Sequence, residues 1–168
     1  IRKMSSAKPK VADYPFTTLY PNLGVVSVGM LQSFVMADIP GLIKGAAEGS
    51  GLGLEFLRHL ERTKILLHIL DLSSDNVEME PINAFKDIDS ELKKYSEELY
   101  KKPRWLVFNK IDLVAPSDLD LMCEKIIDAI GWQGKVLRVS ALSGEGCDII
   151  AKNIMKELDE MASEEISS

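Results

Sequence analysis

Short apolar segments that alternate with amphipathic stretches constrain the fold of this chain more than any other feature of its sequence. Each apolar segment is rich in aliphatic and β-branched residues and runs into a polar residue at its carboxyl end, a pattern typical of buried strands. We expect four such strands, at Ser33–Ile39, Lys64–Leu72, Arg104–Ile111 and Lys135–Ser140.

Three amphipathic helices are predicted between and after these strands. One extends over Pro81–Tyr100 and is closed by Pro103, and the next runs from an N-cap at Ser117 to Gly131. A third begins after Gly146. Strands that alternate with helices of this length are joined by crossovers and are therefore parallel. The sequence thus predicts an α/β fold with a doubly wound, mostly parallel sheet, which binds ligands at the carboxyl ends of its strands.

Length and composition bound the organisation of the chain and its partners. Its 168 residues suggest one domain, which we expect over residues 1–161, with a frayed polar tail at 162–168. The start lacks Met and reads like the middle of a helix, which suggests a fragment. An excess of 26 Asp+Glu over 20 Lys+Arg argues against a general nucleic-acid coat protein. No apolar run approaches the ~20 residues of a membrane span. Two cysteines without a CxxC pair or a secretory leader favour a reducing cytoplasm.

The sequence NKID, after the third predicted strand, has the chemistry to recognise guanine. The carboxylate of Asp112 can accept hydrogen bonds from the ring N–H and the exocyclic amine of guanine, whereas adenine would present a lone pair. Because a carboxylate facing a lone pair costs more than a missing contact, Asp112 would also reject adenine. Asn109 can tie neighbouring loops together, and the stem of Lys110 can cover the base. The alternative is an ordinary strand exit with a solvated lysine.

A second short motif, Ser140-Ala141-Leu142, follows the last predicted strand. Backbone N–H groups in this loop could donate to the guanine carbonyl oxygen, where adenine carries a donor instead. The motif alone carries little information, and the glycines after it are also typical of a plain turn before a helix.

Two segments nearer the start have the chemistry to hold magnesium and phosphate. In Asp38-Ile39-Pro40-Gly41, the Asp ends a predicted strand and can hold Mg²⁺ through a water, while Gly41 lets a backbone N–H approach a phosphate. A dense glycine run follows, which suggests a segment that orders with a ligand, or else a flexible surface loop. The segment Asp13–Leu19 comes before a strand expected near Gly24. A threonine there could bind Mg²⁺ through its hydroxyl and the terminal phosphate through its backbone N–H. Residue type alone does not choose between Thr17 and Thr18.

Together these motifs resemble the Obg family of translational GTPases, which belongs to the P-loop class. The likeness is close over Lys8–Val26 and Asp38–Thr63, and it extends through NKID and SAL to about Leu158. The resemblance implies a P-loop G-domain fold, with Thr18 and Asp38 as magnesium ligands. It implies nucleotide contacts at Phe16, Thr17, Thr18, Leu19, Tyr20, Asp38, Ile39, Pro40, Gly41, Asn109, Lys110, Ile111, Asp112, Ser140, Ala141 and Leu142.

The resemblance also implies a function: a Mg²⁺-dependent switch that binds and hydrolyses GTP and acts in assembly of the large ribosomal subunit. The family's phosphate-binding GxxxxGKS/T loop is expected directly before Ile1, so the chain as written should bind nucleotide poorly and hydrolyse none. No catalytic residue is assigned, because Leu42 stands where many small GTPases use Gln to orient water. The alternatives are a non-hydrolysing interaction module and an α/β enzyme for another phosphorylated ligand. His68 is expected to be a hydrogen-bonded core residue rather than a base.

Overall fold

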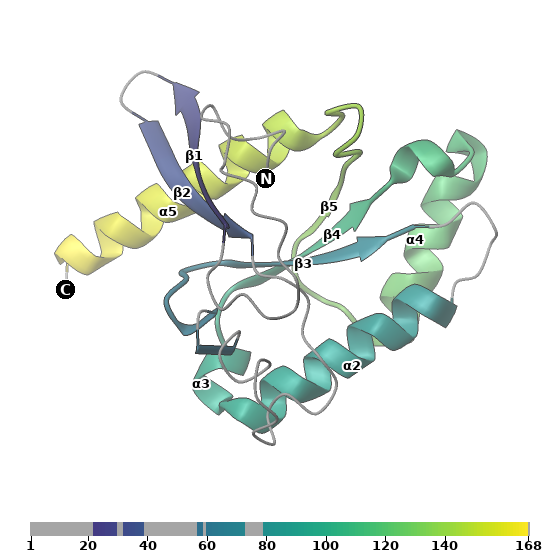
Figure 1. Cartoon of the computed structure of the whole chain (residues 1–168), viewed down its shortest axis with the longest axis horizontal. Coiled ribbons are helices and arrows are strands. Elements are labelled where there is room, and N and C mark those ends of the chain that lie inside the picture. Colours follow the sequence, from purple (N-terminus) through teal and green to yellow (C-terminus); the bar gives the residue numbers. More distant parts are fainter. Residues whose placement is uncertain (1–21, 30–31, 39–56, 59, 73–78, 168) are drawn as a thin grey trace.

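The computed structural model describes residues 22–29, 32–38, 57–58, 60–72 and 79–167 of the chain. From β3 onward its strands alternate with helices, as the sequence predicts (Figure 1). In chain order they are β1 Asn22–Gly29, β2 Gln32–Asp38, β3 Leu66–Asp71, α2 Met79–Tyr95, α3 Glu97–Tyr100, β4 Arg104–Asn109, a 3₁₀ turn at Ile111–Leu113, α4 Pro116–Ile130, β5 Val136–Arg138 and α5 Cys147–Ser167.

The described strands form two sheets. Strands β3, β4 and β5 are parallel and lie side by side in that order, whereas β1 and β2 form an antiparallel pair. The register of the parallel sheet places Asp71 opposite Asn109 and Phe108 opposite Arg138. The carboxyl ends of the three parallel strands therefore meet at one edge, where an α/β sheet binds its ligands.

Helices cover both faces of the parallel sheet. Leu106 and Phe108 of β4 pack with α2 and α4 in one apolar cluster, while Trp105 and Val107 pack with α5 in another. Both faces of β4 are buried at residues 105–108, which explains why this part of the strand is continuously apolar rather than alternating. The predicted α/β fold with a doubly covered parallel sheet is confirmed.

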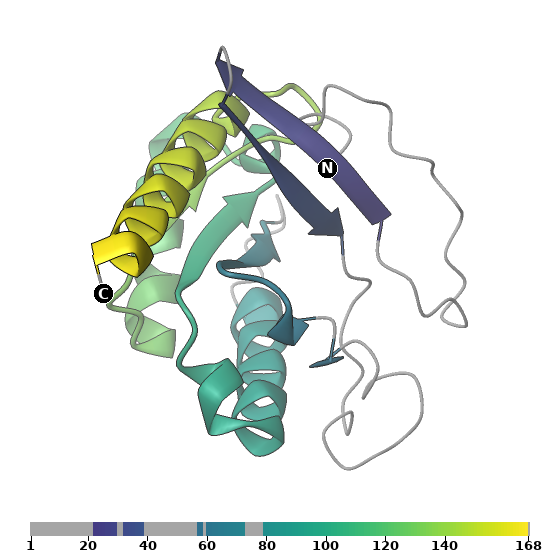
Figure 2. The same cartoon turned by 90° about the vertical axis from the view of Figure 1, so that its left-hand side faces the viewer.

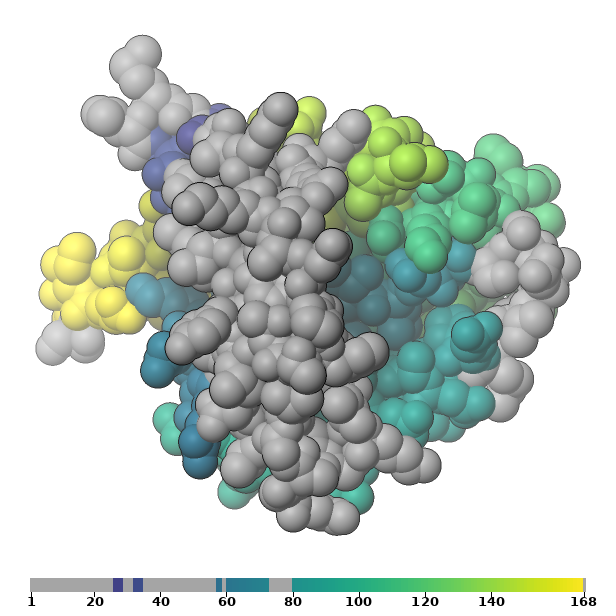
Figure 3. All heavy atoms as spheres, viewed as in Figure 1, coloured from purple at the N-terminus to yellow at the C-terminus, as the bar shows by residue number. Residues whose placement is uncertain are grey.

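The antiparallel pair packs against α5. Val26 of β1 and Phe34 of β2 share a cluster with Ile150 and Ile154 of α5, and Figure 2 shows the pair running beside that helix. The space-filling view in Figure 3 places the end of α5 and the helix α4 on opposite sides of the molecule. None of the described helices combines the length and apolarity needed to cross a membrane.

Several element boundaries differ from the sequence expectations. The single helix expected over Pro81–Tyr100 is divided, because Ser96 adopts an extended backbone (φ −162°) and its side chain accepts from the N–H of Leu99, as an N-cap. Helix α4 begins at Pro116 and not after a Ser117 cap, since proline suits the first helical position. It ends, as predicted, at Gly131, whose φ of 69° is left-handed.

The remaining boundary differences concern the ends of β4, β5 and α5. Strand β4 stops at Asn109 because Lys110 is left-handed, and β5 is shorter than the expected Lys135–Ser140. The segment expected to be a frayed tail, 162–168, is helical up to Ser167 as part of α5.

Candidate functional site: a cluster at the strand ends

Asn109 joins the ends of three strands. Its Nδ2 donates to Oδ1 of Asp71 at 3.2 Å, and its Oδ1 accepts from the backbone N–H of Ala141 at 3.0 Å. Because Asp71 ends β3, Asn109 ends β4 and Ala141 follows β5, one amide links all three. The prediction that Asn109 ties neighbouring loops together is confirmed. We call Asp71, Asn109, Lys110 and Ala141 the strand-end cluster.

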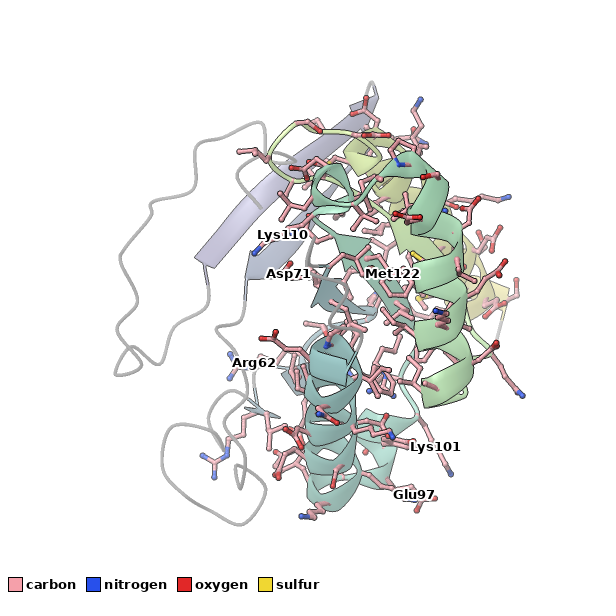
Figure 4. All side chains as sticks on the ribbon, turned by 90° about the vertical axis from the view of Figure 1, so that its right-hand side faces the viewer. Arg62, Asp71, Glu97, Lys101, Lys110 and Met122 are labelled. Carbon is pink, nitrogen blue, oxygen red and sulfur yellow. The ribbon has the colours of Figure 1, made fainter. Side chains whose placement is uncertain are left out.

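Lys110 turns the chain sharply out of β4. Its φ of 62° is left-handed, which is uncommon for a residue with a side chain. Its Nζ lies 3.1 Å from Oδ2 of Asp71, and both side chains are about half exposed. Figure 4 shows the two labelled side chains close together. The backbone N–H of Ile111 donates to the carbonyl of Val139 at 3.3 Å, so the turn that follows is pinned to the segment after β5.

The turn after Lys110 presents Asp112 and buries its neighbour. Ile111 is 8% exposed and belongs to the apolar core formed with Leu106 and Phe108, so its side chain anchors the turn. Asp112 is exposed, as a side chain that reads a base edge must be. Leu113, next in the turn, is also exposed, at 48%.

The loop after β5 is held by its own hydrogen bonds. Ser140 is fully buried, its Oγ accepts from the N–H of Ser143 at 3.2 Å, and its backbone N–H donates to the carbonyl of Glu145 at 2.9 Å. Gly146 has a φ of +79°, and a Cβ there would lie 2.3 Å from the carbonyl oxygen of Arg138. The loop is therefore built around a position that only glycine fits.

Ala141 and Leu142 of this loop face solvent, and Leu142 is 83% exposed. The N–H of Ala141 is committed to Asn109. Donation from this amide to a guanine carbonyl, as the sequence suggests, would therefore compete with the bond to Asn109.

The phosphate and magnesium half of the predicted site lies outside the described residues. This holds for Phe16, Thr17, Thr18, Leu19, Tyr20, Ile39, Pro40 and Gly41. Asp38 is the last residue of β2, at a strand tip as predicted, and its side chain is not among those described. Thr18 and Asp38 thus stay predictions as magnesium ligands.

Asp71 is the residue of the cluster that sequence reasoning missed. The sequence marked it only as the polar end of an apolar strand, whereas both of its oxygens contact the NKID segment. The only signal in the sequence was that a polar residue ends strand β3. That Asp71 pairs with Asn109 follows from the strand register, which the sequence does not give.

His68 corrects another expectation. It is buried and stacks on Phe85 with ring centroids 4.7 Å apart, as a core residue would. However, neither ring nitrogen has a hydrogen-bond partner among the described residues, so the expectation that it is hydrogen-bonded was wrong. Burial, assisted by the charge of Arg104, lowers its pKa to about 4. A neutral imidazole in this setting is a core side chain rather than a base at the strand ends.

Comparison with solved structures places this architecture among GTPases. The chain is similar to a variant of Era from Aquifex aeolicus bound to GDP and AlF4⁻, with a TM-score of 0.64 and 19% identity. This match covers 92% of the chain but only 50% of that structure, so the chain spans half its length. A protein from Plasmodium falciparum described as nucleolar GTP-binding protein 1 matches with a TM-score of 0.62 and 25% identity, covering 98% of this chain and 81% of that one.

The family comparison concerns the sequence itself. Residues 1–110, which are most of the 168, match the family model described as 50S ribosome-binding GTPase. The matched range ends within NKID, at the turn that the strand-end cluster holds. The chain therefore belongs to the 50S ribosome-binding GTPase family and carries a GTP-binding domain of that class.

Proposed function

We propose that this chain is the guanine-nucleotide domain of an Obg-type GTPase, a Mg²⁺-dependent switch that acts in the cytoplasm in assembly of the large ribosomal subunit. The observation that carries the proposal is the amide of Asn109, which connects the turn bearing Asp112 to the SAL loop. The family description names the 50S particle, and the sequence likeness over Lys8–Val26 and Asp38–Thr63 favours the Obg branch.

The base-reading half of the proposed site works by matching donors to acceptors. Asp112 accepts from the ring N–H and the exocyclic amine of guanine, and Leu142 and Ala141 line the loop that faces the base carbonyl. The Asn109 bond holds these two segments at a fixed separation before the nucleotide arrives. Binding then requires little reordering of the loops, which favours affinity.

The proposed phosphate half contains Thr18 and Asp38, which would hold Mg²⁺. When bound, the ion neutralises charge on the phosphate oxygens. Asp38 closes β2, and a strand-tip carboxylate is a suitable oxygen ligand for a hard cation. Segments 16–20 and 38–41 would become ordered when the terminal phosphate of GTP is bound and would be released after hydrolysis. The ribosomal partner would then bind the two states with different affinities. Hydrolysis is expected to be slow, because the apolar Leu42 cannot orient a water.

Titration calorimetry with the full-length protein tests nucleotide choice. In Mg²⁺ buffer, GDP is expected to bind at least about a hundredfold more tightly than ADP, because an adenine would leave the Asp112 carboxylate facing a lone pair. Equal affinities for GDP and ADP would contradict the GTPase assignment and favour another phosphorylated ligand.

Sedimentation tests the proposed partner. Full-length protein loaded with a non-hydrolysable GTP analogue is expected to pellet with purified large ribosomal subunits, and GDP-loaded protein to stay mainly in the supernatant. Small subunits serve as the control particle. Pelleting that is the same for both nucleotides, or for both subunits, would contradict a nucleotide-controlled role on the large subunit.

A further inference from the structure

Asp71 makes two contacts with the NKID segment, one through each carboxylate oxygen. Oδ1 accepts from Nδ2 of Asn109 at 3.2 Å, and Oδ2 lies 3.1 Å from Nζ of Lys110. These residues are brought together from 38 positions away by the parallel register of β3 and β4. The N–H of Leu72 also donates to the carbonyl of Asn109 at 3.0 Å, so the backbone beside the pair is held as well.

The first contact sets the orientation of the Asn109 amide. A carboxylate only accepts hydrogen bonds, so it can face the Nδ2 of Asn109 and not the Oδ1. With Nδ2 turned toward Asp71, Oδ1 is turned toward the N–H of Ala141, where it accepts at 3.0 Å. A side chain at position 71 that could also donate would allow the opposite orientation, which would break the link to the SAL loop.

The second contact, the ion pair between Asp71 and Lys110, restrains the turn that follows β4. Lys110 holds a left-handed backbone conformation, which costs free energy and needs support from its surroundings. The ion pair with Asp71 restrains the lysine stem, and the next residues of the same turn carry Asp112. Both contacts therefore lead from Asp71 to the groups proposed to face the base.

We propose that Asp71 is a positioning residue for guanine recognition, which orients Asn109 and restrains Lys110 so that Asp112 and the SAL loop hold the geometry that a guanine requires. This inference rests on the proposed guanine-nucleotide function. Asp71 is about half exposed, and exposed ion pairs contribute little to folding, so its replacement should leave a folded protein.

The experiment measures GDP and IDP binding to the full-length protein by calorimetry. IDP lacks the exocyclic amine, so it keeps one of the two hydrogen bonds proposed for Asp112. Asp71→Ala is expected to lower GDP affinity about fivefold and IDP affinity less, so that the ratio of GDP to IDP affinity falls. Asp71→Asn can accept from Asn109, but it can also donate and so allows the opposite amide orientation, and it carries no charge for Lys110. Its GDP affinity is therefore expected to fall between that of the wild type and that of Asp71→Ala.

The matched control is Glu97→Ala. It breaks the exposed Glu97–Lys101 ion pair, 2.9 Å long, which Figure 4 shows well apart from the labelled Asp71 and Lys110. This variant is expected to bind both nucleotides like the wild type. Thermal unfolding without nucleotide is measured for each variant, and the midpoint of Asp71→Ala is expected to match that of Glu97→Ala.

The outcomes separate this inference from the proposed function. If the wild type binds GDP and ADP equally, the proposed function fails. If the wild type selects guanine but Asp71→Ala leaves the GDP-to-IDP ratio unchanged, only the role of Asp71 is overturned. An equal fall in both affinities together with a lower unfolding midpoint would also overturn it, because that result marks a purely structural residue.

Discussion

At the scale of single residues, His68 is unusual because its polar ring is buried without a hydrogen bond to any described residue. Its ring is 6% exposed, its neighbours include Phe85 and Arg104, and its nitrogens have no partner among the described residues. The apolar pattern of its strand predicts that it is buried, and that is confirmed. The missing partners were not predictable, because they depend on side chains that α2 and β4 bring from elsewhere in the chain.

His68 makes stability depend on pH. Burial and the charge of Arg104 lower its pKa from 6.5 to about 4, against a smaller opposing effect of Asp89. Well above pH 6.5 the imidazole is neutral in both the folded and the unfolded state. As the pH falls toward 4, the unfolded chain takes up a proton on this imidazole before the folded chain does. The free energy of unfolding is therefore about 3 kcal/mol lower at pH 4 than at neutral pH.

Urea unfolding between pH 7 and pH 4 checks this expectation. The variant His68→Phe keeps an aromatic ring to stack on Phe85 and has no titrating group, so the part of the pH dependence that His68 contributes should be absent. If the wild type and His68→Phe lose the same stability over this range, the buried neutral imidazole is not the cause.

At the scale of elements, the sequence predicts where strands and helices occur better than where they end. Strand β4 is recognisable because both of its faces are covered and its residues 105–108 are all apolar and buried. Boundaries depend on single backbone conformations, such as the left-handed Lys110 that ends β4. The amphipathic pattern of Pro81–Tyr100 continues across Ser96 and therefore hides the break between α2 and α3.

The break at Ser96 makes a testable difference. Its side chain caps α3 by accepting from the N–H of Leu99 at 3.2 Å, so Ser96→Ala is expected to destabilise the protein by about 1 kcal/mol. Ser90→Ala, at an exposed position inside α2, is the control and should be neutral or slightly stabilising. Chemical unfolding measures both. A more stable Ser96→Ala protein would indicate that one continuous helix is the preferred form.

At the scale of the whole molecule, the alternation of strands and helices predicts the parallel sheet, and the sheet predicts the edge at which NKID and SAL meet. The bond between Asn109 and Ala141 spans 32 positions and is anticipated by this topology. The contacts of Asp71 are not predictable from the topology alone. They depend on the strand register that places Asp71 opposite Asn109. The phosphate half, around Thr18, lies beyond the described residues and stays a prediction.

The central claim is that Asp112 reads the base, and one substitution tests it most directly. In Asp112→Asn an amide replaces the carboxylate, so a donor faces the guanine amine, while the carbonyl at the same position of xanthine is a matching acceptor. Asp128→Asn, an exposed carboxylate near the end of α4, is the control. Calorimetry of the full-length protein should show GDP affinity falling at least about a hundredfold in Asp112→Asn while XDP affinity rises. If that variant binds GDP as tightly as Asp128→Asn does, Asp112 does not face the base and the account is wrong.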